Sequence, residues 1–95
     1  MRSPFTVRTS ENVASIIRSL HPELKRAVKA AITAVAANPE AGEPLRGELE
    51  KYWKYRVRRY RLVYEIDRGK RVIRLLVLGH RQDVYEDFAT RQKSS

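Results

Sequence analysis

The sequence predicts an α+β fold in which a short strand and a two-helix hairpin precede an antiparallel three-stranded meander. Apolar residues recur with helical spacing between residues 11 and 37, and from Tyr52 onward they alternate with polar residues as in strands. The segment Asp67-Arg68-Gly69-Lys70 separates two alternating stretches and has the composition of a hairpin turn. Together these observations predict a four-stranded sheet with both helices on one face.

A strand and a capped helix come first. Phe5, Val7 and Arg8 predict the strand. Ser10 follows where its hydroxyl can accept a free backbone N–H at the start of a helix. The apolar residues of that helix fall at i, i+3, i+4 and i+7: Val13, Ile16, Ile17 and Leu20. This spacing places one apolar stripe against a core.

A second helix follows almost directly. Pro22 suits the first helical turn, and an alanine-rich apolar stripe then keeps the helical period. Asn38-Pro39 ends the helix, because the residue before a proline is pushed out of the helical region. We expect a loop from Glu40 to Glu48, which contains Pro44 and two glycines.

Three strands complete the predicted sheet. Arg58-Arg59, a junction without glycine, separates the first strand from the second, and residues 67–70 separate the second from the third. The third strand is apolar on both faces, which is typical of a central position. Residues 85–92 predict a short C-terminal helix.

One face of this sheet is free of helices and carries cations. If the aromatic residues of the first meander strand meet the helices, Lys54, Arg56 and Arg58 point to the opposite face. Their spacing of roughly 6.5 to 7 Å resembles the distance between successive phosphates of a nucleic-acid strand. We therefore expect these three residues to bind the backbone of a nucleic-acid substrate.

The net charge of +9 is concentrated in the same third of the sequence. Residues 51–81 contain eleven Lys or Arg against Glu65 and Asp67, and the remainder is balanced. Such a concentration attracts polyanions, nucleic acid first. A solvated arginine-rich surface is the alternative interpretation. A membrane role suits the sequence less, because the cations follow a strand pattern and not an amphipathic helix.

Composition excludes several classes of protein. With 95 residues the chain is expected to form one domain, residues 1–95. The absence of cysteine rules out disulfides and thiolate metal sites, and we expect no metal or other cofactor. There is no signal-like apolar run at the start and no stretch of about 18 apolar residues, so we expect a cytoplasmic protein.

An ordered set of segments resembles the RelE branch of the RelE/ParE toxin superfamily. The segments are 45–49 with 53–57, then 60–64, and finally Gly-His-Arg-Gln-Asp-Val-Tyr at 79–85. The resemblance implies a toxin of a type II toxin–antitoxin system that cuts mRNA in the ribosomal A site without a metal. In that family the 2′-OH of the RNA attacks the adjacent phosphate, and a cognate acidic antitoxin silences the toxin in a hetero-oligomeric complex.

The resemblance also implies site residues. Lys54 and Arg56 match two cations of a strand motif, Arg61 matches the arginine after the strand tyrosine, and Arg81 and Tyr85 match C-terminal motif residues. This sequence departs from the family at the Arg58-Arg59 turn, which is about two residues shorter than in the best-known members. It also has His80 where some relatives have lysine.

Elementary chemistry supports catalytic and substrate-binding roles for these residues. Arg61 and Arg81 have planar forks suited to phosphate, but neither can readily act as a base. His80, kept neutral by surrounding cations, could accept the 2′-OH proton, and Lys54 is the alternative base. Tyr85 could stack on an unpaired base or hold the nucleotide through its hydroxyl, or it could simply anchor the terminal helix.

Two other functions remain open. A ParE-like toxin would poison DNA gyrase without catalysis on a very similar fold, and fold alone does not separate the two activities. A module that has lost activity would still bind RNA or the ribosome. The joint presence of phosphate-directed cations with His80 and Tyr85 favours the ribonuclease, because a gyrase binder has no chemical need for them.

Overall fold

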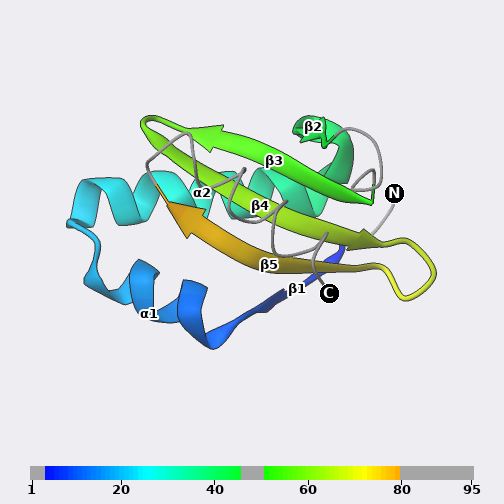
Figure 1. The fold of residues 1–95 in the computed structure, drawn as a ribbon, viewed down its shortest axis with the longest axis horizontal. Coiled ribbons are helices and arrows are strands. Elements are labelled where there is room, and N and C mark those ends of the chain that lie inside the picture. Colours follow the sequence, from blue (N-terminus) through cyan, green and yellow to red (C-terminus); the bar gives the residue numbers. More distant parts are fainter. Residues whose placement is uncertain (1–3, 46–50, 80–95) are drawn as a thin grey trace, which may run out of the picture.

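A computed structural model describes residues 4–45 and 51–79 and has two helices on one face of a mixed sheet (Figure 1). The sheet order is β1-β5-β4-β3-β2. The predicted α+β class is therefore confirmed. The elements in chain order are β1 (Thr6–Thr9), α1 (Glu11–Ser19), α2 (Pro22–Ala37), the 3₁₀ turn η1 (Pro39–Ala41), β2 (Glu43–Pro44), β3 (Tyr52–Val57), β4 (Tyr60–Asp67) and β5 (Val72–Gly79).

The helix boundaries follow the predicted caps. The Val13 N–H donates to the Ser10 hydroxyl at 3.2 Å, which makes Ser10 the N-cap of α1. α2 begins at Pro22 and ends where Asn38 adopts an extended conformation before Pro39. The Asn38 side chain then accepts the Glu40 N–H at 3.3 Å and starts η1.

The sheet combines one parallel pair with an antiparallel meander. β3, β4 and β5 pair antiparallel, as predicted, through turns at 58–59 and 68–71, the second of which lies one residue later than predicted. β1 pairs parallel with β5, so β5 lies between two strands, and its apolar character on both faces is explained. A register shift opposite Val63 and Tyr64 makes Leu76 an extra residue of β5.

The predicted strand count of four is wrong, because residues 43–44 of the predicted loop form β2 against β3. The Tyr64 hydroxyl donates to the Pro39 carbonyl at 2.7 Å and holds the start of η1 against the sheet. Gly42 permits this approach, since a Cβ there would collide with the Lys54 carbonyl and lie 2.6 Å from the Tyr64 hydroxyl. Burial raises the pKa of Tyr64 to about 12.

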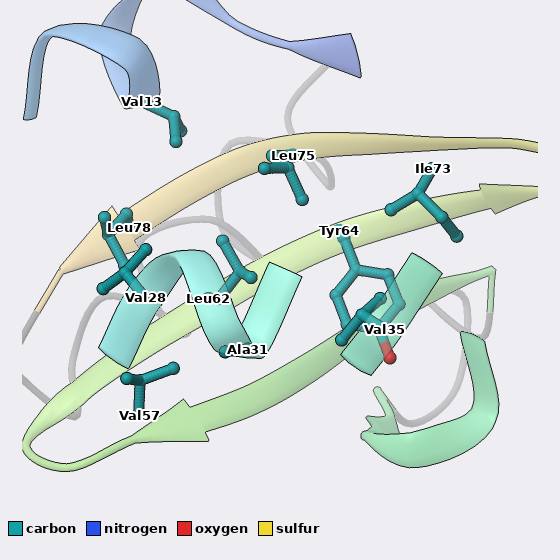
Figure 2. Close-up of a cluster of buried hydrophobic side chains, with 10 residues drawn as sticks. All are labelled: Val13, Val28, Ala31, Val35, Val57, Leu62, Tyr64, Ile73, Leu75 and Leu78. Atoms are coloured by element: carbon teal, nitrogen blue, oxygen red, sulfur yellow. The ribbon is translucent and has the colours of Figure 1, made fainter. Parts of the chain in front are cut away.

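The core lies between the helices and the sheet (Figure 2). The helices contribute small apolar residues, and the strands contribute larger ones around the fully buried Tyr64. Trp53 and Tyr55 pack against this core and are partly buried, which confirms that this side of β3 meets the helices. The intervening residues Lys54 and Arg56 therefore belong to the opposite face, which we call the open face. The core residues are Val13, Val28, Ala31, Val35, Val57, Leu62, Tyr64, Ile73, Leu75 and Leu78.

Candidate nucleic-acid interface

Three strands present their side chains in register on the open face. Because paired residues of neighbouring strands point to the same side, each register position defines a row across the face. From the β3–β4 turn toward the β4–β5 turn, the rows are Arg56, Arg61 and Gly79, then Lys54, Val63 and Val77, then Tyr52, Glu65 and Arg74. The two turns lie at opposite ends of the sheet (Figure 1).

The row beside the β3–β4 turn, which we call the cationic end, brings Arg56 and Arg61 directly opposite each other. Within residues 4–45 and 51–79, neither guanidinium has a carboxylate within 4.0 Å. Like charges facing each other across a strand pair are unfavourable unless an anion offsets them. The geometry therefore suits a phosphate bound between the two side chains.

Both guanidinium groups are held by the turn. The Arg56 Nε–H donates to the Arg58 carbonyl at 3.0 Å, and the Arg61 Nη1 donates to the Arg59 carbonyl at 3.3 Å. Sequence reasoning missed these acceptors, because main-chain carbonyls leave no mark in side-chain patterns. The one hint in the sequence that this turn is unusual was the two-residue connection Arg58-Arg59, which contains no glycine.

Lys54 occupies the next row, and its side chain is half-buried. Its Nζ lies 3.9 Å from the Glu43 carboxylate on β2, at the limit of an ion pair, and the Glu43 side chain is 78% exposed. Pairs of this kind contribute little, because water screens both groups. Lys54 thus lies beside the cationic end, as predicted, with a weakly held carboxylate near it.

Arg58 is not part of the row predicted for it. β3 ends at Val57, and Arg58 is the first residue of the turn, with φ 55. Two-residue hairpin turns of the primed types require a positive φ at this position, which takes Arg58 out of the strand alternation. Arg58 lines a cavity of about 270 Å³ together with Leu24 of α2, Arg59 and Tyr60. The predicted row of three cations therefore has two members on the strand.

The other end of the open face is also charged, but its charges are paired. Arg74 lies 3.6 Å from Glu65 and 3.3 Å from Asp67, and Lys51 lies 3.9 Å from Glu65. Asp67 also accepts the Lys70 N–H at 3.0 Å, and this bond, with a smaller contribution from Arg74, lowers the pKa of the Asp67 carboxyl. Glu65 and Asp67 are therefore both paired with cations. We call this region the paired end.

An apolar strip separates the two ends. Tyr52 and Val63 are buried, and Leu45, Leu76 and Val77 pack against them. The open face is therefore not uniformly basic. It has cations without carboxylate partners at one end of the described sheet, an apolar middle, and a neutralised cluster at the other end.

Three predicted site residues, His80, Arg81 and Tyr85, lie outside the described residues, as does the predicted C-terminal helix. Gly79, the last described residue of β5, is in register with Arg61, and His80 and Arg81 follow it in the sequence. In the described part of the chain, no group of His, Cys, Asp and Glu side chains could hold a metal ion. Among the same residues, no helix is both long and apolar enough to cross a membrane.

Comparison with known proteins gives a family match over most of the chain. Residues 7–89 match the family model described as the ParE-like toxin of type II bacterial toxin–antitoxin systems. Toxin RelG of Mycobacterium tuberculosis is 33% identical over 84 residues, covering 86% of this chain and 97% of that toxin.

Solved structures of toxins share the fold. The toxin–antitoxin complex RelBE2 of Mycobacterium tuberculosis contains a chain that is 30% identical, with a TM-score of 0.73 and coverage of 87% of this chain and 98% of that one. The isolated RelE toxin of E. coli is 27% identical, with a TM-score of 0.71 and coverage of 92% and 97%. The similarity therefore extends over nearly the full length of each relative.

Proposed function

The chain belongs to the ParE-like toxin family of type II toxin–antitoxin systems, and within it we propose a RelE-like endoribonuclease that cuts mRNA on the ribosome. The observation that carries this proposal is the facing pair Arg56 and Arg61, which has no carboxylate partner among the described residues and is in register with Gly79. A phosphate between these side chains would remove their mutual repulsion. The likeness to RelG and RelE toxins supports the same activity.

The proposed reaction needs no metal. The 2′-oxygen of the RNA attacks the adjacent phosphorus while the bond from phosphorus to the 5′-oxygen breaks, which leaves a 2′,3′-cyclic phosphate and a 5′-OH. A base takes the 2′-OH proton, and the departing 5′-oxygen gains a proton. Negative charge that gathers on the phosphoryl oxygens is stabilised by nearby guanidinium groups.

We assign the phosphoryl oxygens to Arg61 and Arg81, because a planar guanidinium can donate two parallel N–H bonds to a phosphate. Arg56 and Lys54 bind the flanking backbone of the substrate, with Arg58 at the edge of this surface. His80 is our first candidate for the base and Lys54 the second. Tyr85 holds the nucleotide by stacking or through its hydroxyl.

The same charge implies a partner. A free toxin of net charge +9 would bind RNA indiscriminately, so we propose that an acidic cognate antitoxin covers part of the open face in a hetero-oligomeric complex. The structure of the related RelBE2 complex supports such a pairing. The toxin would act in the cytoplasm, where ribosomes translate.

Primer extension on mRNA in a translating extract tests the proposal. We expect cuts in codons at the ribosomal A site with the wild-type chain and none with Arg81→Ala. Arg18→Ala is the matched control, because Arg18 is an exposed arginine on α1 and lies outside the open face. The family also includes the ParE type, so the same extract is assayed with DNA gyrase. Gyrase-dependent DNA breaks with intact mRNA would overturn the ribonuclease.

A further inference from the structure

We propose that the two-residue turn between β3 and β4 is a positioning element whose main-chain carbonyls aim Arg56 and Arg61 at the phosphate backbone of the substrate. The inference rests on the proposed function and adds to it a role for Arg58 and Arg59 that their side chains do not perform. Arg58 and Arg59 would act through Arg56 and Arg61 and would not touch the reacting atoms themselves.

The two hydrogen bonds are symmetric about the hairpin. Each arginine bonds the turn residue that lies two positions away along its own strand, Arg58 for Arg56 and Arg59 for Arg61. Both contacts are solvent-exposed, and the arginines face each other across the strand pair. Without a fixed acceptor, repulsion would turn two such side chains away from each other into solvent. The two carbonyls instead hold each guanidinium beside the turn.

The two hydrogen bonds to the turn also determine which guanidinium N–H donors remain available to a phosphate. A guanidinium has five N–H donors in a planar fork, and its Nε and Nη2 groups form the edge that can bind a phosphate side-on. Arg61 uses Nη1 for the turn, so this edge stays available. Arg56 uses Nε, so it can offer only its terminal Nη groups. The turn thus gives the facing arginines different roles, with Arg61 suited to a side-on phosphate contact and Arg56 to an end-on one.

The backbone of the turn explains why its carbonyls are in place. Arg58 has φ 55, a left-handed conformation that non-glycine residues seldom adopt. Such residues persist where the surrounding structure over-determines them, and they cluster at functional sites. Arg58 and Arg59 line a cavity together with Leu24 and Tyr60, both of which pack against the core. The turn thus lies beside Leu24 of α2, and its main-chain oxygens accept hydrogen bonds from two arginines of the open face.

A pair of variants separates the main chain from the side chains. The reference variant, Arg58→Gly with Arg59→Ser, keeps a two-residue turn of the primed type. The expanded variant carries the same substitutions and two additional glycines between positions 58 and 59. Both lack the same two charges, so they differ in the length of the turn and in the positions of its carbonyls. The probe is a 2′-O-methyl RNA hexamer, which cannot be cut through its 2′-oxygen, and thermal melting checks that both variants fold.

We expect the expanded variant to bind the hexamer about 10-fold more weakly than the reference variant, because two side chains lose their preorganisation. NMR should show slow solvent exchange of the Arg56 Nε–H in the wild-type chain and in the reference variant, and fast exchange in the expanded variant. Equal affinities for the two variants would overturn the proposal.

Solvent exchange of the Arg56 Nε–H in the wild-type chain tests the positioning role even if the expanded variant does not fold. An Arg56 Nε–H that exchanges as fast as an unbonded arginine Nε–H would reject the positioning role. The proposed function fails separately: a wild-type chain that leaves mRNA intact in the extract refutes the ribonuclease, and the affinity difference still reports on the turn.

Discussion

The cationic end and the paired end of the open face carry the same kind of side chain in opposite electrostatic states. Arg74 at the paired end is shared by Glu65 and Asp67, whereas Arg56 and Arg61 at the cationic end have no carboxylate within reach among the described residues. A count of cations in the sequence does not distinguish these ends. Strand register sets the partners of each arginine, and we therefore expect it to determine where a polyanion can bind.

The single strand β4 contributes residues to both the cationic end and the paired end. β4 places Arg61 at one end and Glu65 and Asp67 at the other, all on the same face because the side-chain period is two. The paired cluster leaves little net field of its own, so the field of the face is concentrated beside Gly79. We therefore expect the RNA backbone to bind at the cationic end of the open face.

The strongest test of this comparison removes one arginine from each end. Arg61→Ala should lower the rate of mRNA cutting by about 10²- to 10³-fold, as expected for the loss of a donor to developing phosphoryl charge. Arg74→Ala removes the same charge from the same face and should change the rate by no more than about threefold, because its guanidinium is already neutralised. Rates are measured by primer extension at saturating ribosomes. Equal losses in the two variants would show that bulk charge, and not position, matters.

Much of the fold could be predicted because its determinants are local. The Ser10 cap, Pro22 and the two hydrophobic periods lie within a few residues of the elements they specify. β2 could not be predicted, since two residues cannot show an alternation. It depends on the contact between Tyr64 and Pro39, which are 25 residues apart, and on the close approach at Gly42.

The candidate site, like the fold, could be predicted from the sequence only in part. Alternation along β3 correctly placed Lys54 and Arg56 on the open face. It misplaced Arg58, because a positive φ in the turn interrupts the alternation. Which arginines are neutralised depends on pairing between strands, as with Arg74 and Glu65, so charge counts could not reveal it.

A second test converts the paired end into a cationic end. Glu65→Gln with Asp67→Asn releases Arg74, which can then contact one more phosphate. We expect affinity for the 2′-O-methyl RNA hexamer to rise about 3- to 10-fold, and the slope of log K against log salt to steepen by about 0.7.

The matched control for this test is Glu11→Gln with Glu23→Gln, which adds the same two charges on the exposed sides of the helices. We expect a smaller gain in affinity and an unchanged salt slope. If both double variants behave alike, the carboxylates of the paired end do not limit where RNA binds.

The smallest expected effect is on stability in acid. The Lys70 N–H and, secondarily, Arg74 lower the pKa of Asp67 below its unfolded value, so the unfolded chain binds a proton before the folded chain does. The stability that Asp67 contributes is therefore present above roughly pH 4 and is lost as the pH falls through its lower folded pKa. Asp67→Asn should lower the melting temperature at pH 6, and the two curves should converge toward pH 2.5. Curves that stay parallel over this range would mean that Asp67 is not held by these contacts. In that case Arg74 would be less fully neutralised, and only its contact with Glu65 would distinguish it from Arg56 and Arg61.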